Sequence, residues 1–282
     1  GNIQFGSNTA IWYQNNIEIP FFNYHLKGKG SVSNIPEATI FFSGENKWHK
    51  LGEWPPKGKT DQVMFLQPQG RLGWTKPAAS TTFTEYTSDP ARPVPYTEDV
   101  HMRRTVQYMT DDQRFASRRP DVTVFETEVL TEDLTLAGTV VADLLVSTTG
   151  TDVDLVVKVI DVFPNDFVYE KKSNYPMGGY QMLIRGEVMR GKFRNSFEKP
   201  EAFTPNKVAR VKFELPDVAH TFKKGHKLMV QIQSSWFPLV DRNPQKFLNI
   251  YTAKDSDYQK ASIRIYHDAK NSSGITLPVW KK

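Results

Sequence analysis

Hydrophobic and polar residues follow one another along most of the chain in short runs, a pattern typical of β-strands. Most of these runs are separated by Gly, Pro, Asn or Asp, the residues that favour turns. The runs cover residues 38–44, 62–68, 121–130, 134–148, 154–163, 180–190, 209–216, 226–235 and 262–267. Many short strands without helices between them predict a mainly β protein, an all-β sandwich of jelly-roll type.

The run at residues 152–159 shows the alternation most clearly. One side of it carries Val153, Leu155, Val157 and Val159, and the other carries Asp152, Asp154, Val156 and Lys158. Because successive side chains of a strand point to opposite faces, we expect one face in the core and one wetter face.

Residues 9–27 form the one convincing helical stretch, and they are dense enough in apolar residues for a buried helix face. We expect Pro20 to split or kink this helix, because proline has no backbone N–H to donate. Gly28 and Gly30 are expected to end it, and residues 31–36 to form a connector.

Residues 76–120 interrupt the strands with prolines at positions 77, 90, 93, 95 and 120. We expect no regular strand in this proline-rich excursion. A long irregular segment inside a compact domain is usually functional or interfacial, because its backbone polar groups must find partners elsewhere.

Composition narrows the classes of protein and partner. The chain has 282 residues with a net charge of +5, and its 39% hydrophobic and 24% charged residues are typical of a folded globular protein. Zero cysteines exclude disulfides, thiol catalysis and thiolate metal sites. No apolar run reaches the roughly 18 to 20 residues of a membrane helix, and basic residues are interleaved with acidic ones. We therefore expect neither a membrane nor a nucleic acid as partner.

The usual signatures of catalysis and metal binding are weak. No serine lies in a G-x-S-x-G turn, and in the nearest imitation, residues 5–9, Ser7 is expected to cap a helix. The six histidines show no H-x-x-x-H spacing, and His226 is expected to be a turn residue bonded at a strand edge. Paired carboxylates at 111–112, 132–133 and 152/154 are expected in solvated turns. The sequence thus predicts no catalytic residue, no metal and no cofactor.

Aromatic residues are in excess, with 18 Phe, 11 Tyr and 6 Trp. Those in or beside expected loops are Trp48, Trp54, Trp74, Trp236 and Phe237. Exposed loop aromatics on a sandwich indicate either sugar stacking or a large contact with another domain. The first reading leaves open a free-standing carbohydrate-binding module that uses Trp54, Trp74 or Trp236 as stacking platforms.

Seven short motifs follow one another over nearly the whole chain. In order they are E-N-K-W with E-W-P-P (45–56), S-D-P with P-V-P (88–95), D-Q-R with R-P-D-V (112–122), D-V-F-P (161–164), R-G-K-F-R (190–194), F-K-K-G-H (222–226) and S-S-W-F-P-x-x-D-R-N-P (234–244). Together they resemble the C-terminal domain of the X-Pro dipeptidyl-peptidase, cocaine esterase and α-amino-acid ester hydrolase family of serine hydrolases. The particular form of these motifs is similar to that in bacterial proteins described as glutaryl-7-aminocephalosporanic-acid acylases.

The resemblance implies a jelly roll of galactose-binding-like fold that carries no catalytic residue, because the family's Ser, Asp and His belong to a preceding α/β-hydrolase domain. Residues 1–35 resemble the last helical segment of that domain, and residues 36–282 resemble the C-terminal jelly roll. His25 lies on the helix and is not the triad base. The implied partners are the upstream hydrolase domain, an ester, amide or peptide substrate of the whole enzyme, and further subunits. The family implies a bacterial periplasmic or secreted location.

The role implied for the sandwich is to pack on the hydrolase domain and close one side of its substrate cleft. Candidates for the cleft or the domain interface are Tyr96, His101, Arg104, Trp236, Phe237, Asp241, Arg242 and Asn243. Simple packing of Trp236 and Phe237, and a turn-fixing pair of Asp241 with Arg242, stay open as structural alternatives.

Overall fold

In a computed structural model of the chain, residues 1–78, 80–169 and 175–281 are described. The strands are β1 (Ala38–Phe42), β2 (Lys47–Leu51), β3 (Lys59–Gln67), β4 (Arg71–Gly73), β5 (Phe83–Ser88), β6 (Val122–Glu126), β7 (Leu134–Thr148), β8 (Asp154–Val162), β9 (Gln181–Arg190), β10 (Ala209–Phe222), β11 (Lys227–Gln233), β12 (Ala261–Tyr266) and β13 (Gly274–Trp280). The helices are α1 (Thr9–Tyr13), the π-turn η1 (Gln14–Glu18), α2 (Ile19–Lys27) and α3 (Arg114–Ser117). Short 3-10 turns are η2 (Pro68–Gly70), η3 (Gln107–Thr110), η4 (Gly191–Phe193), η5 (Ile250–Thr252) and η6 (Asp255–Asp257).

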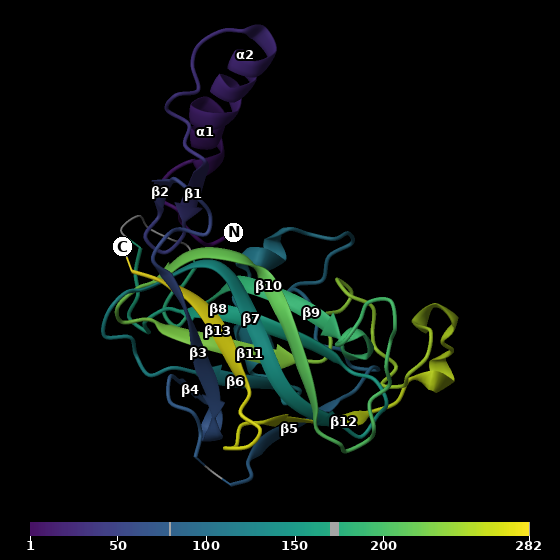
Figure 1. The fold of residues 1–282 in the computed structure, drawn as a ribbon. Coiled ribbons are helices and arrows are strands. Elements are labelled where there is room, and N and C mark those ends of the chain that lie inside the picture. The colour runs from purple at the N-terminus through teal and green to yellow at the C-terminus, as the bar shows by residue number, and fades with distance from the viewer. Residues whose placement is uncertain (79, 170–174, 282) are drawn as a thin grey trace.

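The strands form a small sheet and a large one (Figure 1). The hairpin β1–β2 stands by itself, and the other strands pair in the order β5-β12-β7-β13-β3-β4-β6-β11-β8-β9, with β10 also on β7. Apart from one parallel bridge between β4 and β6, this pairing is antiparallel. The 15-residue β7 pairs with β10, β12 and β13, so one long strand ties together parts of the sheet that fold over each other.

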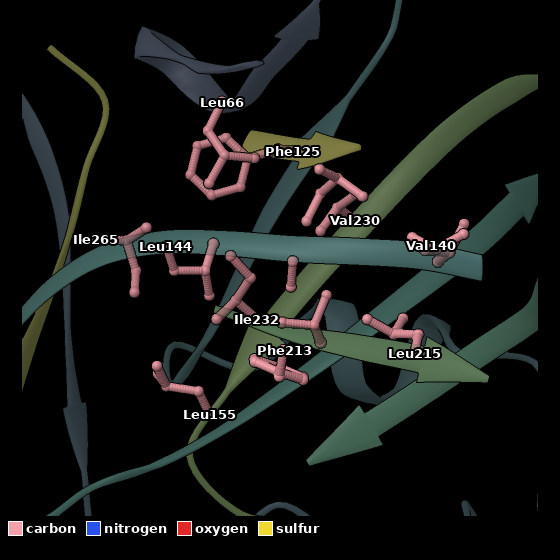
Figure 2. Packing of buried hydrophobic residues seen from close by; sticks show 14 of the residues in the cluster. Leu66, Phe125, Val140, Leu144, Leu155, Phe213, Leu215, Val230, Ile232 and Ile265 are labelled. Atoms are coloured by element: carbon pink, nitrogen blue, oxygen red, sulfur yellow. The ribbon is translucent and has the colours of Figure 1, made fainter. Parts of the chain in front are cut away.

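The core lies inside this folded sheet. Its buried side chains come from every strand from β3 to β13, and Figure 2 shows Leu66, Leu144 and Phe213 converging from three of these strands. Side chains that alternate along strands from both layers fill one shared interior, which is the organisation of a β-sandwich. The mainly β sandwich predicted from the sequence is confirmed.

All nine predicted strand runs contain a strand, but four further strands were missed. β2, β4, β5 and β13 lie outside the predicted runs. β5 contradicts the expectation that residues 76–120 hold no regular strand, because residues 83–88 contain no proline and pair with β12. β13 contains Pro278, which is tolerated because the pairing of β13 with β7 shifts register between Thr276 and Val279.

The wetter face predicted for β8 is wrong. Asp154, Val156 and Lys158 are all buried. A second apolar cluster covers this outer face, and it joins Tyr96, Val156, Ile160, Leu183, Met229 and Trp236. The cover comes from the proline-rich excursion and from residues 236–240, which are distant from β8 in sequence and close in space.

The predicted helix is present but divided. Asn8, not Ser7, caps α1 with its side chain, which accepts a hydrogen bond from the N–H of Ile11. The helix widens into η1 directly before Pro20, which cannot donate to the carbonyl four residues earlier. Gly28 ends α2 in the left-handed conformation, φ 63°.

The expected buried face of the helix is not covered within the chain. None of the residues of α1, η1 and α2 is buried, and these elements project beyond the hairpin β1–β2, away from the sandwich (Figure 1). In the described part of the chain, no helix is long and apolar enough to span a membrane.

Candidate functional site

A cavity of about 600 Å³ lies between the proline-rich excursion and the loop that follows β11. Its walls are mainly apolar, formed by Pro93, Pro95, Tyr96, Phe237, Pro238 and Leu239. Its rim is charged and carries Glu98, Asp99, His101, Arg103 and Arg104. Four of the eight predicted site residues therefore meet at one place.

Two segments that are far apart in the sequence are tied together to make the apolar wall. The N–H of Tyr96 donates to the carbonyl of Phe237 at 2.9 Å, and the N–H of Phe237 donates to the carbonyl of Val94 at 3.0 Å. The hydroxyl of Ser235 accepts a further bond from the N–H of Val94 at 2.8 Å. Prolines at 93 and 95 keep this segment extended, so the wall is fixed by main-chain bonds.

Trp236 lies behind the wall and is only 6% exposed. Its ring packs edge-to-face on Tyr108, which in turn contacts Tyr96, with ring centroids 5.9 and 5.4 Å apart. Trp236 also lies over Gly186 of β9, where a Cβ atom would come within 2.8 Å of the indole. Trp236 thus supports the cavity wall and does not line it.

A buried lysine supports the same region from the sheet. Lys158 of β8 has no exposed surface, and its Nζ donates to Oε1 of Gln113 at 3.0 Å. The amine lies 5.2 Å from the ring of Trp236 and 5.9 Å from that of Phe115. Burial lowers the pKa of Lys158 from 10.5 to about 7. Lys158 was expected on a wetter face of the strand, although a lysine inside the apolar run D-L-V-V-K-V-I-D-V was a visible signal of a buried amine.

Asp241, Arg242 and Asn243 do not line the cavity. Arg242 donates to the carbonyl of Pro90 at 3.0 Å, and its guanidinium lies 5.7 Å from the ring of Phe237, so it braces the wall. Asn243 is buried and donates to Oδ1 of Asp154 at 2.7 Å. Asp241 is exposed, and only its carbonyl takes part, accepting from Arg190 at 3.0 Å.

The carboxylates of residues 152 and 154 are buried and do not lie in a solvated turn. Burial, with the charge of Asp154 nearby, raises the pKa of Asp152 from 3.8 to about 6. Nε and Nη2 of Arg190 donate to the two carboxylate oxygens of Asp154 at 3.0 and 2.9 Å. The Asp154–Arg190 pair anchors the loop after β11, because Asn243 of that loop donates to Asp154 and the carbonyl of Asp241 accepts from Arg190.

The charged rim stands away from the sandwich. Val100 and Met102 are fully exposed on either side of His101. Burial and the nearby charges of Asp112, Asp99 and Asp111 raise the pKa of Glu98. The cavity is therefore apolar inside with charges at its mouth. Among the described residues, no group of three or more His, Asp or Glu is arranged to hold a metal ion.

The three tryptophans expected as sugar platforms differ in exposure. Trp236 is buried, and Trp54 is half-buried with its Nε1 donating to Asp217 at 2.6 Å. Trp74 is 46% exposed. The structure therefore contradicts the expectation of an exposed platform at Trp236.

The chain is similar to known proteins over nearly its whole length. Cocaine esterase from Rhodococcus sp. (strain MB1 Bresler) is 28% identical over 271 residues, which are 93% of this chain and 45% of that protein. The solved structure of an aminopeptidase from the marine sediment archaeon Thaumarchaeota archaeon matches 100% of the chain and 46% of its own, with 39% identity and a TM-score of 0.92. That of an α-amino acid ester hydrolase labelled with selenomethionine matches 99% of the chain and 47% of its own, with 40% identity and a TM-score of 0.93. The chain thus spans about half the length of these relatives.

The family model described as the X-Pro dipeptidyl-peptidase C-terminal non-catalytic domain matches residues 31–276. This range covers nearly the whole sandwich and begins in the connector after α2. The chain belongs to the family of X-Pro dipeptidyl-peptidase C-terminal non-catalytic domains.

Proposed function

We propose that the chain is the non-catalytic part of a serine hydrolase that cleaves esters or amides, and that its cavity forms one wall of the substrate cleft. The observation that carries this proposal is the convergence of Tyr96, His101, Arg104 and Phe237 on one cavity. The relatives of about twice the length, named as an esterase, an aminopeptidase and an ester hydrolase, support the presence of a catalytic α/β-hydrolase domain beside it.

The helical segment is the proposed docking surface for that domain. Its large apolar side chains are exposed, namely Ile11, Tyr13, Ile19, Phe21, Phe22, Tyr24 and Leu26. An apolar face of this kind normally packs on a partner, because leaving it in water forfeits roughly 25 cal/mol per Å². A hollow of about 550 Å³ between the helices and residues 32–39 adds a concave part to the same surface.

The cavity wall would contribute binding and not bond-breaking. Apolar side chains beside a nucleophile exclude water and fit the acyl or aryl part of a substrate. The charged rim would select among substrates by their charge.

The test compares the chain alone with a longer polypeptide in which an α/β-hydrolase domain precedes residue 1. With p-nitrophenyl esters, we expect turnover by the longer protein and none above background by the chain alone. Turnover by the chain alone at the rate of the longer protein would overturn the proposal. Retention of the chain on immobilised glycans would instead favour the carbohydrate-binding alternative.

A substitution in the wall tests the second part of the proposal. In the longer protein, Phe237→Ala is expected to raise KM for a p-nitrophenyl ester of a bulky acyl group by about three- to tenfold, because part of an aromatic contact is lost. KM for the acetyl ester should change little. Phe197→Ala removes an exposed aromatic that does not line the cavity and serves as the control. Equal effects of both variants would contradict the proposed wall.

A further inference from the structure

The hairpin β1–β2 meets the sandwich at Ser43, the residue that follows β1. The N–H of Ser43 donates to the carbonyl of Ala219 at 3.2 Å, and the N–H of Thr221 donates to the carbonyl of Ser43 at 2.9 Å. Gly44 follows with φ +84°, and a Cβ atom there would lie 2.0 Å from the carbonyl oxygen of Thr221. The chain is therefore pressed directly against β10 at this point.

A row of side-chain hydrogen bonds runs from this junction into the sandwich. The hydroxyl of Ser43 lies 2.8 Å from Nδ1 of His220, and Nε2 of His220 lies 3.2 Å from Oδ2 of Asp161. The other carboxylate oxygen of Asp161 lies 2.8 Å from Nδ1 of His226. His220 and Asp161 have at most 1% of their surface exposed. The row joins the end of β1 to β10, β8 and the start of β11.

Asp161 is the centre of this row. Its burial opposes ionisation, but the hydrogen bonds from His220 and His226 outweigh burial and lower the pKa of the carboxyl group. A carboxylate accepts at both oxygens, so it fixes one N–H of each ring toward itself. When His220 donates from Nε2, its Nδ1 is left as the acceptor for the Ser43 hydroxyl.

The order Ser43, His220, Asp161 resembles that of a catalytic triad, but the contacts of Ser43 attach the end of β1 to β10. Its own N–H is used in the bridge to Ala219, whereas a nucleophile needs free N–H groups beside it to hold an oxyanion. The residue is fixed on both sides of its backbone. The contacts of Ser43 therefore favour a structural role.

The hairpin also carries the helical segment. The ring of Trp12 in α1 stacks on that of Trp48 in β2, with centroids 4.3 Å apart and planes at 17°. Trp48 in turn contacts Phe41 of β1, with centroids 5.3 Å apart. A hairpin held firmly at Ser43 thus holds the base of the helical segment.

We propose that Asp161 is a positioning residue which, through His220 and Ser43, locks the hairpin and the base of the helical segment on the sandwich. Its relevance to catalysis rests on the proposed function, since the helical segment is the surface proposed to dock the hydrolase domain. The lock itself is a property of this chain and is measured without that domain.

Hydrogen exchange of the backbone amides of residues 38–51 tests the lock in the whole chain. Ser43→Ala removes the hydroxyl at the hairpin end of the row, which lies 2.8 Å from His220 and 3.4 Å from the carbonyl of Ala219. We therefore expect exchange in the hairpin to rise by about two- to tenfold, as loss of a neutral hydrogen bond implies. Exchange in β7 and β8 should stay unchanged. Ser43→Thr keeps the hydroxyl and should restore the protection.

His226→Gln is the matched control, because it changes the other arm of the same carboxylate. It should alter exchange near residues 224–230 and leave the hairpin as in the unchanged protein. Unaltered hairpin exchange in Ser43→Ala, or an equal rise throughout the sandwich, would overturn the proposal. The proposal also fails if His226→Gln loosens the hairpin as much as Ser43→Ala does.

Discussion

Replacing the buried lysine of β8 by methionine is expected to stabilise the protein. Lys158 has no exposed surface, and burial moves its pKa from 10.5 to about 7. Between pH 7 and 10.5 the unfolded chain therefore binds a proton that the folded chain does not bind, so wild-type stability rises with pH across this window and is flat below it. At 1.36 kcal/mol per pKa unit, the amine costs the fold about 4 kcal/mol at pH 7 and about 2 kcal/mol at pH 9.

Lys158→Met keeps most of the length of the side chain and removes this cost. It also leaves Oε1 of Gln113 without its donor at 3.0 Å, a loss of about 1–3 kcal/mol for a buried acceptor. The net expectation is a gain of about 2 kcal/mol at pH 7 that falls to about zero at pH 9.

Urea unfolding followed by tryptophan fluorescence at pH 7 and pH 9 measures both values. Lys212→Met, at an exposed position of β10, is the control and should change stability little at either pH. A loss of stability in Lys158→Met at pH 7, or a gain that is the same at both pH values, would refute the reasoning. The first result would mean that the amine is charged and well compensated in its aromatic surroundings, and the second that it keeps its proton in the fold up to pH 9.

Three further substitutions follow from the same region. Gly186→Ala places a Cβ atom 2.8 Å from the indole of Trp236, so we expect a loss of about 1–3 kcal/mol in urea unfolding and a changed tryptophan emission. Asn243→Ala removes the 2.7 Å bond to Asp154 and should cost about 1–2 kcal/mol, measured by thermal unfolding against Asn195→Ala as an exposed control. The pKa of Asp152 is raised from 3.8 to about 6, so the folded state holds a proton that the unfolded state releases, and stability falls by about 2 kcal/mol as pH rises from 4 to 6. Asp152→Asn should abolish that fall in urea unfolding, and an unchanged slope would contradict it.

The sandwich could be predicted because its signal is local. The run from Leu134 to Thr148 was predicted with the bounds that β7 has, since a stretch of β-branched and apolar residues specifies a strand without reference to its neighbours. β13 was missed because Pro278 normally excludes a central strand, and only the shifted register opposite β7 makes room for it. Such a shift depends on a partner strand that is distant in the sequence.

The sequence singled out four of the residues that line the cavity, but not how they are arranged. Tyr96 and Phe237 were chosen from separate motifs, and the bridge that joins their segments is a non-local contact. Asn243 resembled a cleft residue in sequence because a buried asparagine and an exposed one look alike there. The helix was predicted to have a buried face, and none of its residues is buried in this chain, because an apolar pattern does not say what covers it.

The buried charges of β8 explain how one strand orders the parts of the domain that surround the proposed cleft. Asp154 holds the loop after β11 through Asn243, Lys158 holds the excursion through Gln113, and Asp161 holds the hairpin through His220. Apolar contacts of the same area would tolerate small slides between these segments, whereas a buried hydrogen bond fails when its partner moves by about 1 Å. Burying a charged group costs free energy, which is why Lys158→Met is expected to stabilise the fold. Its value here is orientation, because the cavity wall and the base of the helical segment are both attached to β8, a strand that is buried along nearly its whole length.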